Sequence, residues 1–138
     1  PGGGGTAQNF QGGIAVTSDY GIGILTPGAI RTRYFAVGGY SSDLGFPMLT
    51  ESKGLATGGA SQAFQNGAIV WSPATGAQVS KGAIRHAWLN NGGEQGFLGY
   101  PVADEYRYLA DGVVAQDFQG GKIIWSARGG TIVSPAHP

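Results

Sequence analysis

The sequence repeats at a spacing of 54 residues. Phe10, Phe64 and Phe118 stand one period apart, and shifting the chain by 54 positions aligns the remaining residues without a gap. Such a period is the signature of a repeat architecture, whose units bury their apolar faces against one another. The other matched positions include Gln62 and Gln116, GAIR at 28–31 and 82–85, and LGFP at 44–47 with LGYP at 98–101.

Each unit opens with a pattern that predicts a three-stranded antiparallel meander. Short apolar runs are separated by Asn-Gly or Gly-Gly turns, where glycine supplies the positive φ of a hairpin turn. The 27 glycines among 138 residues, without a Gly-X-Y period, fit a protein of short strands and tight turns. We expect the three meanders near residues 4–26, 58–80 and 112–134.

The segments between the meanders change to a helical spacing of apolar residues. Ile30 and Tyr34 in the first segment are four positions apart, as are Ile84 and Trp88 in the second, which places each pair on one helix face. A pair of glycines follows as a helix stop, and the proline of LGFP or LGYP then predicts an extended turn. These linkers of helix plus turn are expected near 28–57 and 82–111.

Together these patterns predict a single β-rich repeat domain over residues 1–138, with α+β units in which short helices join the meanders. A meander of this size is not stable alone, so the units must pack around an axis or along a stack. A propeller-like arrangement suits such meanders. The sequence leaves open whether the three units are part of a larger ring or close by self-association.

Composition excludes several classes of protein. The 8 Lys and Arg residues balance the 8 Asp and Glu residues, and the basic residues are too scattered to predict a nucleic-acid partner. No apolar run approaches the ~20 residues of a membrane-spanning helix. Because the sequence contains no cysteine, it can form no disulfide, thiol nucleophile or cysteine zinc site.

The titratable residues form no pattern typical of an enzyme, so we expect no catalytic residue and no cofactor. The two histidines, His86 and His137, lack a GxSxG nucleophile, and among the acids only Asp104 and Glu105 are adjacent. The histidine spacing also predicts no zinc site. A calcium ion held by acidic loop residues stays open as an alternative.

The LGFP and LGYP motifs, each preceded by GAIR and GG and followed by an FQNG or FQGG phrase, resemble the LGFP repeat family. The resemblance spans about residues 4–134. It implies propeller-like arrays in exported actinobacterial proteins, often joined to mycolyltransferases, esterases or peptidoglycan amidases. The implied function is a secreted, non-catalytic module that attaches to cell-wall glycan, either arabinogalactan or peptidoglycan. The glycine-rich opening suggests a longer parent chain.

Several side chains suit a carbohydrate ligand, since aromatic rings stack on sugar faces and charged groups bond to hydroxyls. Trp71 and Trp125 also lie in phase with the apolar residues of their strands, so a core position is the competing interpretation, and Thr17 replaces tryptophan in the first unit. The candidate ligand-binding residues are Trp71, Trp125, Tyr40, Tyr106, Tyr108, Asp104, Arg31 and Arg85.

The two arginines also have a structural interpretation, and the other repeated residues are predicted to be structural. Arg31 and Glu51 are 20 positions apart, as are Arg85 and Glu105, which predicts a repeated ion pair between helix and loop. The glutamine after each repeated phenylalanine is expected to bond backbone groups freed by the turn. The structural motif residues are Phe10, Gln11, Phe64, Gln65, Phe118, Gln119, Leu44, Gly45, Phe46, Pro47, Leu98, Gly99, Tyr100 and Pro101.

An alternative function is protein interaction or self-assembly, accessory to an envelope hydrolase or mycolyltransferase. Terminal units of a repeat array expose strand edges and apolar surface, which favours association with another chain. Several weak glycan sites, by contrast, raise the avidity for a cell wall without any tight pocket. Sedimentation with cell walls tests the first hypothesis, and concentration-dependent association tests the second.

Overall fold

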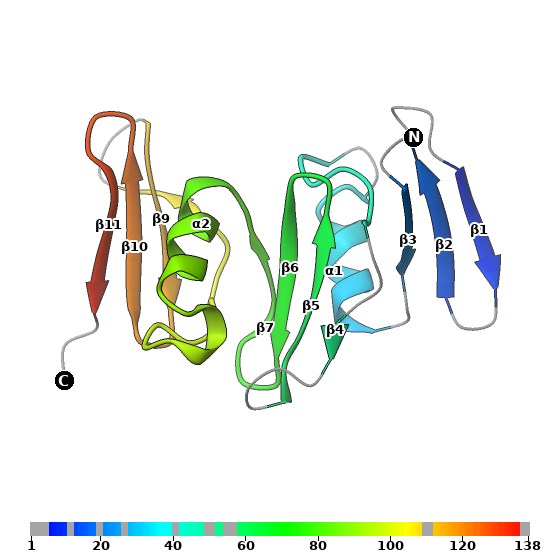
Figure 1. The fold of residues 1–138 in the computed structure, drawn as a ribbon, viewed down its shortest axis with the longest axis horizontal. Helices are drawn as coiled ribbons and strands as arrows, with labels where there is room; N and C mark the ends of the chain where they lie inside the picture. Colours follow the sequence, from blue (N-terminus) through cyan, green and yellow to red (C-terminus); the bar gives the residue numbers. More distant parts are fainter. Residues whose placement is uncertain are drawn as a thin grey trace.

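The structure, a computed structural model, describes residues 6–10, 13–18, 21–25, 28–39, 42–48, 52–53, 58–108 and 112–135. Three antiparallel sheets and two helices follow one another along the long axis of the molecule (Figure 1). The predicted β-rich repeat fold with meanders and short helices is therefore confirmed.

The three sheets, named A, B and C in chain order, are built from neighbouring strands. Sheet A has the order β1 (Thr6–Phe10), β2 (Gly13–Ser18), β3 (Gly21–Leu25). Sheet B has the order β4 (Ser52–Lys53), β5 (Ala60–Phe64), β6 (Gly67–Ser72), β7 (Gly76–Ser80). Sheet C has the order β11 (Gly130–Pro135), β10 (Gly121–Ser126), β9 (Val113–Phe118), β8 (Tyr106–Arg107). The short edge strands β4 and β8 were not predicted.

Each helix covers the sheet that follows it in the chain. Helix α1 (Ala29–Ala36) packs on β6 and β7, and helix α2 (Gly82–Asn90), which leads into the 3-10 turn η4 (Gly93–Gln95), packs on β10 and β11. The structural unit therefore begins at a helix rather than at a meander. Sheet A is the meander of the first unit, sheet B that of the second and sheet C that of the third.

The sheets and helices alternate along a line: sheet A, α1, sheet B, α2, sheet C (Figure 1). The described residues form no closed ring, so the expected propeller-like arrangement is not confirmed. Core 1 joins sheet A, α1 and sheet B through Val16, Leu25, Ile30, Tyr34, Leu44, Phe46, Ala60, Phe64 and Ile69. Core 2 joins sheet B, α2 and sheet C through Val70, Ile84, Ala87, Trp88, Leu98, Tyr100, Phe118 and Ile123.

An aromatic side chain on each helix ties the helix to the LGFP turn. The hydroxyl of Tyr34 donates to the carbonyl of Gly45 at 2.6 Å, and the indole nitrogen of Trp88 donates to the carbonyl of Gly99 at 2.8 Å. Both rings are buried, so these bonds satisfy polar atoms that would otherwise be costly to bury. The predicted core positions of both aromatics are observed.

The LGFP turn also forms hydrogen bonds with the FQ phrase of the same unit. The backbone amide of Gln119 donates to Tyr100 at 3.0 Å, and the Gln119 side-chain oxygen accepts from the amide of Tyr100 at 3.0 Å. Gly99 has a φ of 69°, and a side chain there would lie 2.6 Å from that Gln119 oxygen. The positive φ and this close approach both favour glycine at this position, and the LGFP turn and the FQ phrase are in direct contact.

The first unit is one residue shorter in one loop and one residue longer in the next linker. The two changes cancel, so the 54-residue period has no gap in the sequence. Ser18 pairs with Gly21 across a two-residue loop, whereas Ser72 pairs with Gly76 across a three-residue loop. In return, Leu25 stands five positions before Ile30, whereas its counterpart Ser80 stands four positions before Ile84. As a result Ile24 is the structural counterpart of Val79 and not of the residue 54 positions on.

Candidate functional site

A cleft opens where the second and third units meet, and we call it the inter-unit cleft. It has a volume of about 430 Å³ and adjoins a smaller hollow of about 210 Å³. Its lining residues are Asp43, Asn66, Lys81, Gly82, Ala83, Ile84, Glu105, Val114 and Trp125. The smaller hollow shares Asp43, Lys81 and Glu105 with it, so the two form one depression along the joint.

Trp125 is the predicted ligand residue that lines the cleft. Its ring is half-buried, packing against core 2 on one side and lining the cleft on the other. Trp71, its counterpart one unit earlier, packs against core 1 and is also half-buried. Trp125 therefore combines the two roles considered from the sequence, since it packs against the core and also lines the cleft.

Where the other two units carry tryptophan, sheet A carries Thr17, and the cross-strand partner differs as well. Across the strand pair, Trp71 faces Ala77 and Trp125 faces Thr131, so a large residue opposes a small one. In sheet A the sizes are exchanged, because Thr17 faces Ile22. At this position, each of the three sheets therefore pairs one large side chain with one small side chain on the neighbouring strand.

Charged groups surround the mouth of the inter-unit cleft. The ammonium of Lys81 lies 3.6 Å from a carboxylate oxygen of Asp43, whose side chain is 91% exposed. Glu105, which is half-buried, also lines the cleft. The cleft therefore combines an indole surface with two carboxylates and one ammonium, which can accept and donate hydrogen bonds.

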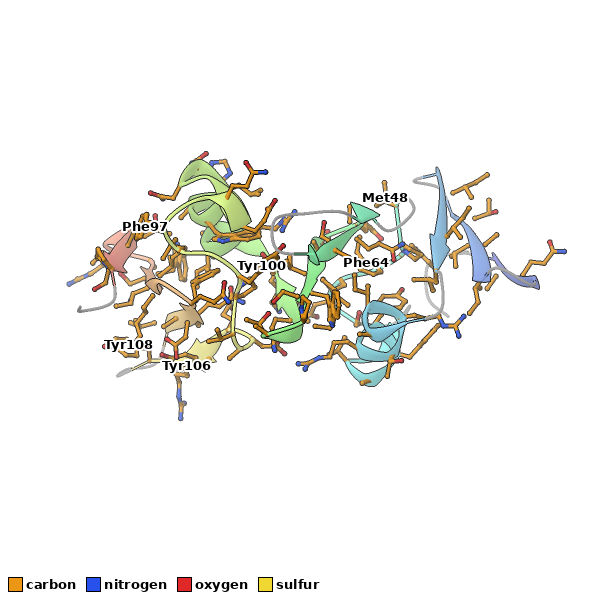
Figure 2. All side chains as sticks on the ribbon, turned by 90° about the horizontal axis from the view of Figure 1, so that it is seen from below. Met48, Phe64, Phe97, Tyr100, Tyr106 and Tyr108 are labelled. Atoms are coloured by element: carbon orange, nitrogen blue, oxygen red, sulfur yellow. The ribbon has the colours of Figure 1, made fainter. Side chains whose placement is uncertain are left out.

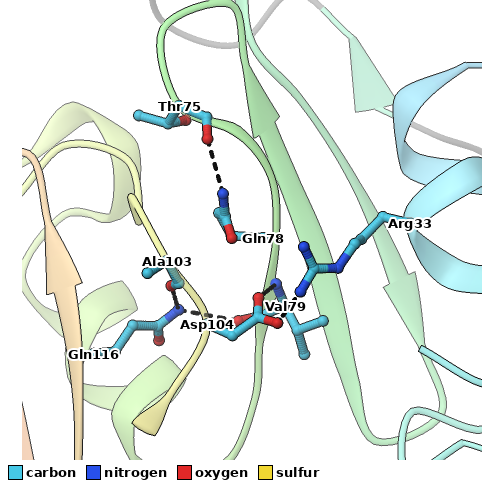
Figure 3. Close-up of polar contacts among 7 residues, drawn as sticks. All are labelled: Arg33, Thr75, Gln78, Val79, Ala103, Asp104 and Gln116. Atoms are coloured by element: carbon cyan, nitrogen blue, oxygen red, sulfur yellow. Dashed lines mark hydrogen bonds and ion pairs between the residues drawn. The ribbon is translucent and has the colours of Figure 1, made fainter. Parts of the chain in front are cut away.

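Asp104, another predicted ligand residue, instead clamps the two units together (Figure 3). One of its carboxylate oxygens accepts from the backbone amide of Val79 at 2.8 Å, and the other forms an ion pair with Arg33 on α1. Gln116 donates to the carbonyl of Val79 at 3.0 Å and to that of Ala103 at 2.9 Å. The outer edge of β7 is thereby bonded by side chains of the next unit, which protects it from pairing with other chains.

The two predicted arginine sites lie on the helices. Arg85 donates to the hydroxyl of Ser80 at 3.2 Å and lies over the Trp88 ring, and burial lowers its pKa from the ordinary value. Within the described ranges no ion pair joins Arg85 to Glu105, so that predicted pair is wrong. Arg31 is half-buried on α1, and its predicted partner Glu51 lies outside the described residues.

Tyr106 and Tyr108 lie at the far end of the molecule, on the outer side of sheet C and away from Tyr100 (Figure 2). The Tyr106 hydroxyl donates to Asp117 at 3.0 Å, and the Lys122 ammonium lies 4.7 Å from the centre of the Tyr108 ring. Tyr108, Asp117 and Lys122 line a separate open hollow of about 460 Å³. These two tyrosines therefore do not share the cleft of Trp125.

The remaining predicted residues are placed as follows. Tyr40 and Gln11 lie outside the described residues, and Phe10 is described only through its pairing in β1. In the part of the chain that the structure covers, no three histidine or acidic side chains group as metal ligands. Over the same part, neither helix is long and apolar enough to cross a membrane.

Asp43, Asn66 and Lys81 line the cleft but were not among the predicted ligand-binding residues, which were mainly aromatic. Lys81 corresponds to Pro27 one period earlier, and Asp43 corresponds to Phe97 one period later. Asn66 corresponds to a glycine in both other units. The signal that could have found them is a lack of repetition. Each is a polar residue at a position where the other units carry glycine, proline or an apolar residue.

The fold and the cleft define a class of repeat protein built from a helix, a glycine-proline turn and a meander. The family model for the LGFP repeat matches residues 44–96 and 98–137, which together cover most of the chain. The chain belongs to the LGFP repeat family. No curated protein matches the chain significantly.

Proposed function

We propose that this chain is a non-catalytic module that binds glycan of the cell envelope at the inter-unit cleft. The observation that carries the proposal is the half-buried indole of Trp125 beside the charged groups of Asp43, Lys81 and Glu105. The indole surface suits the apolar face of a sugar ring, and the charged groups suit its hydroxyls. An open cleft of this kind admits a polymer from the side.

Family membership supports a cell-wall polysaccharide as the ligand class, with arabinogalactan and peptidoglycan as the two candidates. The proposal includes export of the protein to the cell envelope of an actinobacterium. One cleft of modest size gives weak binding, and an array with several joints strengthens attachment by avidity. Such a module would hold an attached enzyme at the wall.

Sedimentation with purified actinobacterial cell walls tests the proposal, with walls used intact and after removal of arabinogalactan. We expect the chain to sediment with intact walls, and Trp125→Phe to weaken binding by about tenfold, which is about 1.4 kcal/mol. Trp71→Phe is the matched control, because Trp71 has the same position in the preceding unit but Pro27 stands where the cleft has Lys81. Circular dichroism of both variants verifies that they fold equally.

A second variant removes the charges at the mouth of the cleft without touching the core. Asp43→Asn with Lys81→Gln keeps similar side-chain shapes, and Asp43 is largely exposed, so folding should be unchanged. We expect severalfold weaker wall binding. Absence of sedimentation with either wall preparation, or equal losses in the Trp125 and Trp71 variants, would overturn the proposal.

Self-assembly is the second candidate function, and exposed apolar residues on the end sheets favour it. Ile22 of sheet A is 61% exposed and Ile132 of sheet C is 56% exposed. Closure of further units into a propeller-like ring belongs to the same proposal, since it would cover both of these end faces. Light scattering over a concentration series tests it, and a monomer at all concentrations counts against association between chains.

A further inference from the structure

The outer face of sheet A lacks the helix that covers the same face of the other two sheets. In sheet B, Ile69 is fully buried beneath α1, and in sheet C, Ile123 is fully buried beneath α2. The strand pairing makes Ala15 the counterpart of both residues. On the same face of sheet A, Ile22 is 61% exposed and Thr17 is exposed.

A glutamine on this face points to the same missing neighbour. Gln62 and Gln116 are 2% and 1% exposed, and each reaches across a joint to the preceding sheet. Gln62 donates to the carbonyl of Ile24 at 2.9 Å, and Gln116 donates to the carbonyl of Val79 at 3.0 Å. Gln8 is their counterpart in sheet A, pairing with Ala15 as Gln62 pairs with Ile69, and its side chain is exposed.

We infer that the outer face of sheet A, formed by Gln8, Ala15, Thr17, Ile22 and Ile24, is a docking surface for one more 54-residue unit joined ahead of it, in the chain order meander, helix and LGFP turn. The helix and LGFP turn of that unit cover Ala15, Ile22 and Ile24, as α1 and α2 cover their sheets. An edge-strand carbonyl of the unit's sheet accepts the Gln8 amide. The inference is independent of glycan binding, because it concerns a different face of the molecule.

A second copy of this chain does not offer the same partner. Both of its helices already lie between its own sheets, so it could present only the outer face of sheet C. On that face Lys122 stands where sheet B has the buried Ala68, and Asp117 stands where sheet B has Ala63. Beside the exposed Ile132, Lys122 and Asp117 would then meet the apolar face of sheet A, and burying these charges costs desolvation energy, so a second copy fits this face less well than a repeat unit does.

The test is a fusion that supplies one more unit in the natural register. Residues 58–111 are duplicated in front of Gly4, because residue 112 lies two periods of 54 after Gly4. Hydrogen exchange of the amides in β2 and β3 is compared with that of the unfused full chain. We expect exchange in the fusion to slow by about tenfold or more, because docking protects these strands from local opening.

Two controls separate docking from a general effect of the longer chain. In the first, the added copies of Ile84 and Trp88 are changed to Asp, which should abolish the protection because this helix can no longer pack. In the second, Ile22→Glu is placed in both proteins. It should remove the protection in the fusion and leave the unfused chain unchanged, since Ile22 is exposed there.

Three outcomes would overturn the inference. They are unchanged exchange in the fusion, equal protection when the added helix carries the Asp substitutions, and equal protection with Ile22→Glu. Concentration-dependent protection of sheet A in the unfused chain would also overturn it, because the partner would then be a second copy.

Discussion

The joint between sheets A and B and the joint between sheets B and C share a scaffold but differ in charge. Both contain an aromatic bonded to the glycine of the LGFP turn and a buried glutamine that reaches the preceding sheet. Only the second joint has the Asp104 clamp on Val79 and Arg33, since Thr50 stands at the position of Asp104 one period earlier. Repeated contacts thus build the array, and unrepeated ones give each joint its own properties.

The helix aromatics should show the largest effect and the closest agreement between the joints. We expect Trp88→Ala and Tyr34→Ala each to lower the free energy of unfolding by about 3–5 kcal/mol, because each ring is buried in its core. Tyr34→Phe isolates the bond to Gly45 and should cost about 1 kcal/mol. Urea denaturation measures all three. A Tyr34→Ala loss below that of Tyr34→Phe would contradict the shared scaffold.

Substitution of the three repeated glutamines should lower the stability of the protein by different amounts, because their side chains have different neighbours. Gln116→Ala leaves the carbonyls of Val79 and Ala103 without this donor and should cost about 2 kcal/mol. Gln62→Ala should also destabilise the chain, because it removes a buried bond to Ile24. Gln8→Ala should change stability by no more than about 0.5 kcal/mol, as for an exposed side chain. Thermal unfolding of the three variants measures these losses of stability. Equal losses would argue against the contacts assigned to the glutamines at the joints.

The Asp104 clamp, which links α1 of the first joint to the segment that follows α2, should give a smaller effect. Asp104→Ala should cost about 1 kcal/mol, since the carboxylate is a third exposed and its ion pair is partly screened. Thr50→Ala serves as the control at the matching sequence position. A double-mutant cycle with Arg33→Ala measures the pairwise coupling. Additive losses would mean that Arg33 and Asp104 stabilise the protein independently.

The tyrosine cluster outside both joints should produce the smallest effect. Burial and the bond to Asp117 raise the pKa of Tyr106 above its ordinary value of 10.0, and the bond to Tyr106 raises the pKa of Lys122. Because both folded pKa values are raised, the stabilisation is complete below the ordinary values and is lost as the pH rises through the folded ones. Ultraviolet titration of Tyr106, with Tyr106→Phe as the control, should reveal a late phenolate transition. A transition at or below the ordinary pKa would contradict the described contacts.

Much of the fold was predictable because it depends on local pattern. Glycine turns and alternating residues predicted the meanders, and the four-residue spacing of Ile84 and Trp88 predicted a helix with one buried face. The candidate site was predictable only in part. Trp125 lines the inter-unit cleft, but Asp104 is held in the joint and Arg85 bonds Ser80 rather than Glu105. The separation of 20 positions that Arg85–Glu105 shares with Arg31–Glu51 did not imply a contact, because a long side chain bonds to whichever group lies near it in the folded chain.

The sequence alone determined that the chain is an array of equivalent units and which residues are repeated. It also determined the turn glycines, because positions such as Gly99 with positive φ admit few other residues. The three-dimensional contacts were needed to establish that each helix covers the sheet after it and that the units stack in a line. They were also needed to establish that a cleft forms beside Trp125 and that a shorter loop in sheet A is offset by a longer linker. These features depend on contacts between residues far apart in the chain, and a period read along the sequence carries no information about which surfaces meet.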